Sequence, residues 1–292
     1  DGVVKLNATD MDQDVIEATP AQVSTPGATT VSVHTIYDIV RKLPSGTQVD
    51  IDSSGNHELT LSAGRSRFTL QSLPVDEFPM LSGGELPHTF SLNAQELRSL
   101  IDRSKFAIST EETRYYLNGI YFHIAKRDDT EVLRAVATDG HRLASVDVPV
   151  PTGAENIPGI IVPRKAITEL RKLIDELNDG VELSLSETAI RFSFDNVVLT
   201  SKLIDGTFPD YERVIPTGND KVMEIDCKLF ADAVDRVSAI SSDKSRAIKL
   251  TLSENLLVLS ASSPEHGSAT EELEVAYKAD ALEIGFNSGY LL

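Results

Sequence analysis

A short polar run, Thr138-Asp139-Gly140-His141-Arg142-Leu143, has the residue types in this chain that come closest to catalytic chemistry. It offers a carboxylate, a possible base and a cation in one predicted loop. A hydrolase built around Asp139 and His141 would also need a nucleophile, and the chain has no Gly-x-Ser-x-Gly elbow. Local acid–histidine pairs serve structure or recognition more often than catalysis. We therefore expect no catalytic residue, and loss of an activity in His141→Ala is what the hydrolase hypothesis requires.

Other chemical motifs are absent from the sequence. There is no Gly-x-x-x-x-Gly-Lys loop for a nucleotide phosphate and no Cys/His set with metal spacing, so we expect no cofactor and no metal. The single cysteine, Cys227, rules out an internal disulfide, favours a cytoplasmic setting and is predicted to be packed. No apolar run approaches the ~20 residues that cross a bilayer, so no membrane partner is expected.

The elements that must position these residues alternate between helices and short strands. Apolar residues with helical spacing predict helices over 35–43, 94–106, 164–177 and 228–240. Thr35 and Asn93 are the predicted N-caps of the first two helices. Period-two alternation predicts strands, as in 49–52, 181–185 and 256–259. Few helices among many short antiparallel strands indicate an α+β fold.

Internal repetition sets the domain organisation. Arg41-Lys42-Leu43 recurs as Arg171-Lys172-Leu173 and Phe78-Pro79 recurs as Phe208-Pro209, both 130 residues later. Asp102-Arg103 recurs as Asp235-Arg236. These matches predict three copies of one module, at 1–86, 87–209 and 210–292. By the same spacing the middle module is complete, the first is expected to lack its N-terminal part, and the third its C-terminal part.

The charge is distributed unevenly between the predicted elements. The formal net charge of −18 argues against a protein that binds nucleic acid over its whole surface. The four predicted helices nevertheless carry 11 Lys and Arg against 8 Asp and Glu. This suits a protein with one DNA-facing surface, although helix propensity alone also favours Lys and Arg. Arg164-Lys165 and Arg114-Tyr115-Tyr116 are candidates for contact with the DNA backbone, and no motif indicates base readout.

Several motifs resemble one known family. Arg114-Tyr115-Tyr116-Leu117-Asn118-Gly119, Ala137 through Leu143, Val162-Pro163-Arg164-Lys165 and Phe208-Pro209-Asp210-Tyr211 are similar to segments of the DNA polymerase III β subunit, the bacterial sliding clamp. The resemblance runs in order over essentially the whole chain. It implies a non-enzymatic processivity factor with the DNA clamp fold, in which three repeated modules of antiparallel sheet turn their helices toward the interior of a ring.

The resemblance also implies partners. These are double-stranded DNA, held non-specifically and topologically, and a second copy of the chain in a head-to-tail homodimer. The DNA polymerase III α subunit, the clamp loader and other proteins with a clamp-binding motif would bind a peptide groove between the second and third modules. A protein-interaction scaffold that uses the same groove without encircling DNA is the alternative. It would be supported if substitution of the helix Lys and Arg residues left DNA retention unchanged.

Residue by residue, the resemblance and the charge pattern give three candidate surfaces. The peptide groove is expected to contain Leu117, Thr138, Gly140, His141, Arg142, Leu143, Pro209, Arg213, Val214, Asn287 and Tyr290. The DNA-facing residues are expected to be Arg41, Lys42, Arg98, Arg103, Lys105, Arg114, Tyr115, Tyr116, Arg164, Lys165, Arg171 and Lys172. The dimer interface is expected to join Phe68 and Leu70 of one chain to Ala239 and Ile240 of the other. Leu117, Leu143 and Val214 also fit a plain core role.

Overall fold

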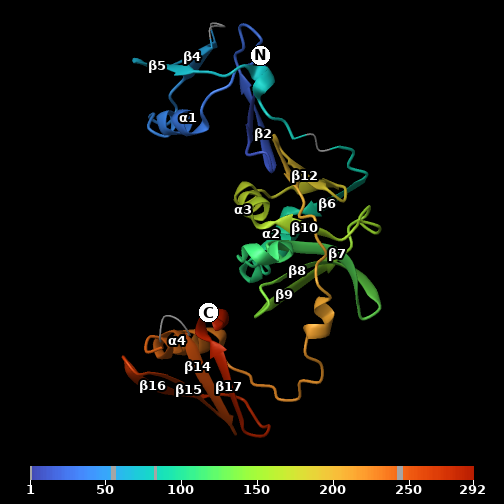
Figure 1. Cartoon of the computed structure of the whole chain (residues 1–292), viewed down its shortest axis with the longest axis vertical. Coiled ribbons are helices and arrows are strands. Elements are labelled where there is room, and N and C mark those ends of the chain that lie inside the picture. Colours follow the sequence, from blue (N-terminus) through green and yellow to red (C-terminus); the bar gives the residue numbers. More distant parts are fainter. Residues whose placement is uncertain (1, 54–56, 82–83, 242–245) are drawn as a thin grey trace. The chain divides into compact units, whose positions relative to one another are not determined.

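The computed structural model describes residues 2–53, 57–81, 84–241 and 246–292. The chain forms two compact units, Asp1–Phe208 and Pro209–Leu292 (Figure 1). Both units combine antiparallel sheets with short helices, so the predicted α+β class is confirmed. No helix among the described residues is long and apolar enough to span a membrane.

The largest sheet of the first unit joins residues far apart in the sequence. Its six antiparallel strands run in the order β1 (Gly2–Thr9), β2 (Gln13–Ala21), β13 (Val197–Lys202), β12 (Ala189–Phe194), β11 (Gly180–Leu185) and β6 (His88–Asn93). The β2–β13 pairing runs from Val197 opposite Glu17 to Ser201 opposite Gln13. The expected first and middle modules therefore share one continuous sheet.

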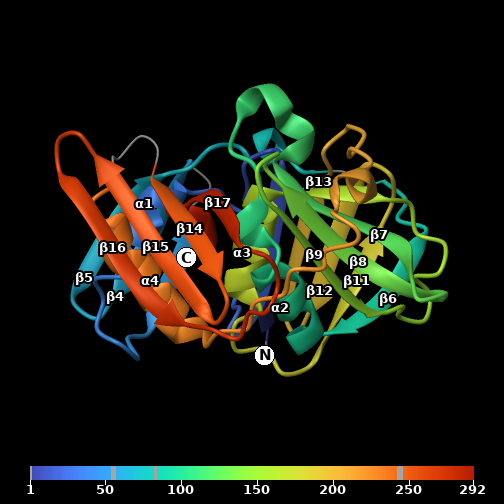
Figure 2. The same ribbon diagram turned by 90° about the horizontal axis from the view of Figure 1, so that it is seen from below.

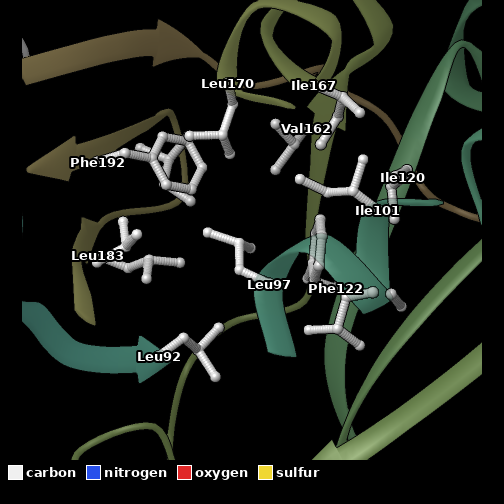
Figure 3. Packing of buried hydrophobic residues seen from close by; sticks show 14 of the residues in the cluster. Leu92, Leu97, Ile101, Ile120, Phe122, Val162, Ile167, Leu170, Leu183 and Phe192 are labelled. Carbon is white, nitrogen blue, oxygen red and sulfur yellow. The ribbon is translucent and has the colours of Figure 1, made fainter. Parts of the chain in front are cut away.

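A second sheet and two helices complete the core of this unit. The sheet has the order β10 (Ile160–Pro163), β7 (Gly119–Arg127), β8 (Thr130–Thr138) and β9 (Leu143–Pro149). Helices α2 (Ala94–Asp102) and α3 (Arg164–Leu173) contribute apolar faces to the same cluster. Figure 3 shows Leu97 and Ile101 of α2 meeting side chains from both sheets, such as Leu183 and Phe122. Burial of these faces is the main source of stability for such short helices.

Polar groups define the ends of α2 and α3. The Asn93 side chain accepts a hydrogen bond from the Gln95 amide, so the predicted N-cap is confirmed. The Arg98 guanidinium of α2 donates through Nη1 to the carbonyl oxygens of Ile174 (2.7 Å) and Leu177 (2.6 Å). These carbonyls follow the C-terminus of α3, where backbone acceptors lack helical partners. Arg98 thus fastens one helix to the end of the next.

A smaller layer forms the rest of the first unit. It has the three-stranded sheet β3 (Val49–Ser53), β4 (Glu58–Ala63) and β5 (Ser66–Gln71), packed with α1 (Val33–Val40) around Leu59 and Leu61. The predicted N-cap Thr35 is wrong. The helix begins after Ser32, whose backbone is extended, and Thr35 lies inside the first turn with its hydroxyl donating to Ser32 Oγ at 3.2 Å.

The second unit contains one sheet and one long helix. The sheet order is β16 (Gly267–Glu274), β15 (Leu256–Ser263), β14 (Ala247–Ser253) and β17 (Leu282–Asn287). Helix α4 (Cys227–Ser238) packs Ala233, Val234 and Val237 against the sheet, and Figure 2 looks onto the strands from the other side. A short helix, α5 (Ser288–Leu291), follows β17. Cys227 is exposed, so its predicted packing is wrong: it begins α4 next to the capping residue Asp226 and outside the apolar stripe.

Candidate functional site

The loop between β8 and β9 is built by its own side chains. Thr138 Oγ1 donates to the Arg142 carbonyl at 2.8 Å and accepts from the Gly140 amide at 3.1 Å. Asp139 Oδ1 accepts from the amides of His141 (2.9 Å) and Arg142 (3.0 Å), and Oδ2 accepts from Arg142 Nε at 3.2 Å. The carboxylate is therefore used to shape the loop, and this leaves the hydrolase hypothesis without its acid.

The environment of Asp139 keeps it ionised. Burial by itself would raise the pKa of the Asp139 carboxyl, but the hydrogen bonds from the Arg142 and His141 amides and from the Arg142 side chain outweigh it. The net effect is a pKa below the ordinary value. Asp139 therefore accepts these hydrogen bonds as a carboxylate in the neutral pH range.

Arg114 connects this loop to the preceding 3-10 segment, η3 (Glu112–Leu117). Its guanidinium binds both oxygens of Glu111 (2.8 and 2.7 Å) and donates to the Asp139 carbonyl at 2.9 Å. Gly140 has φ of +88°, and a Cβ built there would lie 2.5 Å from Arg114 Nη1. The backbone conformation favours glycine at this position, and a larger residue would also require the Arg114 side chain to shift.

The expected groove residues of the first unit differ in exposure. Leu117 is buried at 3% exposure, whereas Leu143 at the start of β9 is half-buried. His141 is exposed, and the Arg142 guanidinium lies 5.4 Å from the centre of the Phe106 ring. Leu117 therefore supports the surface from below, while Leu143, His141 and Arg142 keep part of their surface open to solvent. The structure brings all six first-unit candidates to this one region, around the β8–β9 loop and the end of η3.

The second-unit candidates lie in two segments. Pro209, Arg213 and Val214 belong to the exposed stretch around the 3-10 helix η4 (Tyr211–Val214), where Val214 is 69% exposed and Arg213 pairs with Asp210 at 2.5 Å. Asn287 caps α5 by accepting from the Gly289 amide at 2.9 Å, and Tyr290 follows within that helix. A core role for Val214 is excluded by its exposure.

Most of the cations expected to face DNA have acidic partners. The ion pairs, each with its shortest nitrogen–oxygen distance, are Arg41–Asp38 (2.9 Å), Lys105–Asp102 (2.7 Å), Arg114–Glu111 (2.7 Å), Arg171–Asp175 (2.6 Å), Arg171–Asp102 (2.9 Å) and Lys172–Glu169 (2.9 Å). Lys165 pairs with Asp10, from the turn between β1 and β2. The Lys165 ion pair, together with Lys202–Asp12 at 3.2 Å, therefore reinforces the shared sheet.

Three cations of this set are uncompensated. Across the described ranges no carboxylate pairs with Lys42, Arg103 or Arg164, and all three side chains are exposed. Tyr115 is 54% exposed and meets Tyr116 edge-on with ring centres 5.8 Å apart. Arg98 instead caps α3, as described above. The predicted surface thus divides into free cations, paired cations and one helix cap.

The expected interface residues lie at sheet and helix ends. Phe68 and Leu70 are half-buried on β5, which is the last strand of its sheet. Ala239 is exposed and Ile240 half-buried, directly after α4. Arg236 of α4 binds Glu271 of β16 at 2.6 Å, so this helix end lies beside the last strand of the second-unit sheet.

Sequence reasoning missed the acidic members of these clusters. Asp10, Asp102 and Glu111 each bind a cation that was singled out, and Phe106 lies under Arg142. The i,i+3 spacing of Asp102 with Lys105 and of Glu111 with Arg114 was a visible signal for two of them. No group of three or more His, Cys, Asp or Glu within the described ranges is arranged to hold a metal.

Comparison with known proteins identifies the family. Three family models match the chain. They are those of the N-terminal, central and C-terminal domains of the DNA polymerase III beta subunit, and they match residues 1–82, 91–210 and 212–292. The chain is 49% identical over 290 residues to the beta sliding clamp of Caulobacter vibrioides and 38% identical over 295 residues to that of Escherichia coli K12. These alignments cover 99% and 100% of the chain, and 78% of each relative.

A solved structure agrees with the sequence comparison. The clamp from Bartonella birtlesii bound to griselimycin superposes with a TM-score of 0.96 at 50% identity, covering 100% of this chain and 78% of that one. Family descriptions and relatives therefore agree over the whole length of the chain. The chain belongs to the DNA polymerase III beta subunit family, the bacterial beta sliding clamps, which are processivity factors and not enzymes.

Proposed function

We propose that this protein encircles duplex DNA as a head-to-tail homodimeric ring and tethers the replicative polymerase and other DNA-processing proteins to it. The observation that carries the proposal is family membership along the entire chain. A ring retains DNA by topology, so a net charge of −18 is compatible with the function. The protein acts in the cytoplasm, where the DNA polymerase III α subunit and the clamp loader are its partners.

The proposed DNA surface uses phosphate contacts only. Lys42, Arg103 and Arg164 are its primary contacts because no carboxylate among the described residues pairs with them. The paired cations contribute after they exchange partners, and Arg98 is left out because it caps α3. Contacts to phosphate do not depend on the base sequence, and sliding along DNA requires this independence.

The proposed peptide-binding residues belong to the β8–β9 loop in the first unit and to the segments 209–214 and 287–290 in the second. The loop is preorganised by Thr138 and Asp139, so binding does not have to order it. Leu143 and Val214 offer apolar surface, and His141 and Arg142 offer polar groups to orient a peptide. The proposed module boundaries are 1–86, 87–209 and 210–292, as the repeats indicate.

The proposed dimer interface follows from a pairing within the chain itself. By the repeat, Phe68 and Leu70 of β5 occupy the positions of Leu199 and Ser201 of β13, and β16 occupies the position of β2. Strand β13 pairs with β2, so β5 of one subunit should pair with β16 of the other. Phe68 would then lie against the end of α4, at Ala239 and Ile240.

The test compares how well the protein is retained on circular and on linear DNA. The protein is loaded onto nicked circular DNA with a clamp loader and ATP, the circle is cut, and the complex is passed through gel filtration at high salt. Retention on circles together with loss from linear DNA supports encirclement. Equal retention on both forms, or loss from both with salt, contradicts it and favours a scaffold that uses the groove alone.

A further inference from the structure

The paired cations of the proposed DNA surface converge on one carboxylate more than on any other. Asp102, the last residue of α2, accepts from Lys105 Nζ at 2.7 Å through Oδ1 and from Arg171 Nε at 3.0 and 2.9 Å through both oxygens. Lys105 comes from the 3-10 helix η2 (Lys105–Ala107) and Arg171 from α3. One side chain therefore holds two cations from different elements.

All three side chains remain accessible to solvent. The exposed fraction of the side chain is 38% for Asp102, 46% for Lys105 and 23% for Arg171. Arg171 also binds Asp175 through Nη1 at 2.6 Å. Exposed ion pairs of this type contribute little free energy. A phosphodiester, like a carboxylate, carries one negative charge over two oxygens that accept bonds from Lys and Arg, so either cation can exchange one partner for the other at small cost.

The contrast with the neighbouring residue is informative. Arg103 follows Asp102 directly, is exposed and has no carboxylate partner in the described chain. The same stretch of surface thus carries one cation that is always available and two that are already occupied. A phosphate reaching Lys105 or Arg171 must displace Asp102, so its net gain is reduced.

We propose that Asp102 is an internal competitor of DNA phosphate, which holds Lys105 and Arg171 between successive phosphate contacts and so limits how tightly the ring grips the duplex. This inference rests on the proposed function and adds a regulatory residue to it. The ligand is the phosphodiester backbone of double-stranded DNA. Asp102 itself does not contact DNA; it is a positioning residue that acts through two cations.

The test compares diffusion of the loaded protein on stretched duplex DNA at several salt concentrations. Asp102→Asn keeps the size and one hydrogen-bond acceptor but removes the charge. Each extra phosphate contact steepens the dependence on salt by a logarithmic slope of about 0.9, or about threefold between ~50 and ~200 mM salt. We expect Asp102→Asn to diffuse about threefold more slowly than the original protein at ~50 mM salt, with the difference vanishing at ~200 mM.

Matched variants separate this effect from net charge and from misfolding. Glu187→Gln removes one exposed carboxylate from the turn between β11 and β12 and should leave diffusion unchanged. Adding both Lys105→Gln and Arg171→Gln to Asp102→Asn should abolish the slowing, because the two released cations are then absent. An unchanged rate in Asp102→Asn, or equal slowing by Glu187→Gln, would overturn the inference. Loss of retention on circular DNA by the unsubstituted protein would instead overturn the proposed function.

Discussion

At the scale of single residues, Gly140 is the position in the β8–β9 loop where an added side chain causes the most strain. Gly140→Ala introduces a side chain at φ +88° and 2.5 Å from Arg114 Nη1. The strain is worth roughly 1–3 kcal/mol, and moving Arg114 also breaks its bond to the Asp139 carbonyl. We expect about tenfold weaker binding of a clamp-binding peptide, measured by titration calorimetry, since each ~1.4 kcal/mol is a factor of ten.

The control for Gly140→Ala is another glycine substitution. Gly180→Ala places its Cβ 3.6 Å from the Leu92 carbonyl, which is ordinary contact, and Gly180 is not among the residues with positive φ. It should leave peptide affinity unchanged. Equal affinity in the two variants would show that the loop does not take part in peptide binding.

The charge of Asp139 gives a prediction in pH. Its pKa is lowered in the folded protein, so its contribution to stability is present above the unfolded-state pKa of about 3.9 and is lost as pH falls through the lower folded value. Asp139→Asn should therefore be less stable than the original protein at pH 7. In urea unfolding, the gap between the two should close below pH of about 4. If the difference in stability between the two proteins stays constant down to pH of about 2, the ionised Asp139 carboxylate is not its cause.

Cys227 is the residue whose prediction failed most simply. It was expected to be packed because free cysteine is commonly buried, but it is the first residue of α4, and its side chain is exposed. We expect one thiol per chain to react with Ellman's reagent in the native protein as fast as in the unfolded one. A native rate slower by a factor of about 100 would mean that the cysteine is covered.

At the scale of elements, Arg98 joins two helices. Arg98→Ala removes two hydrogen bonds from a charged donor to the carbonyls that follow α3. Such bonds contribute about 1.5–3 kcal/mol, so the free energy of unfolding in urea should fall by about that amount. Arg103→Ala, at the exposed end of the same helix, is the matched control. Its free energy of unfolding should fall by less than about 0.5 kcal/mol. Similar losses in the two variants would refute the capping role.

How much of the fold was predictable depends on the kind of signal. The four main helices and the strands at 49–52, 181–185 and 256–259 were predicted because their apolar residues repeat with clear periods, as Leu97 and Ile101 do in α2. Asn93 was recognised as an N-cap because it directly precedes the apolar stripe, whereas Thr35 was chosen three residues too late. The sheet that joins β2 to β13 was not predicted, since strand pairing over such a distance leaves no local pattern.

The candidate site was also predictable only where its signal is local in the sequence. The β8–β9 loop was singled out because its residue types are unusual together, and the structure brings Thr138 through Leu143 to one place. The charge pattern located cations but not their partners. Lys165 binds Asp10, which lies 155 residues away in the sequence, and only the folded chain brings the two together. Periodicity and composition carry no information about such pairs.

At the scale of the whole molecule, ring closure depends on two strands at sheet edges. Strands β5 and β16 each end a sheet in the described part of the chain, and an unpaired edge invites a further strand. The β2–β13 junction within the chain is the template for their pairing between subunits. On this template, Phe68 takes the place of Leu199 and lies opposite Ala269, the counterpart of Val15.

Leu70→Asp tests this assembly. It places a charge in the proposed interface, where a desolvated and unpaired carboxylate is strongly unfavourable, so the protein should sediment as a monomer at micromolar concentration. Ile240→Asp, on the opposing surface, should do the same without touching the β5 sheet. Leu73→Asp is the control because Leu73 is 67% exposed beyond the end of β5, and it should leave the dimer intact. If both interface variants remain dimeric while their melting temperatures are unchanged, the subunits join through another surface.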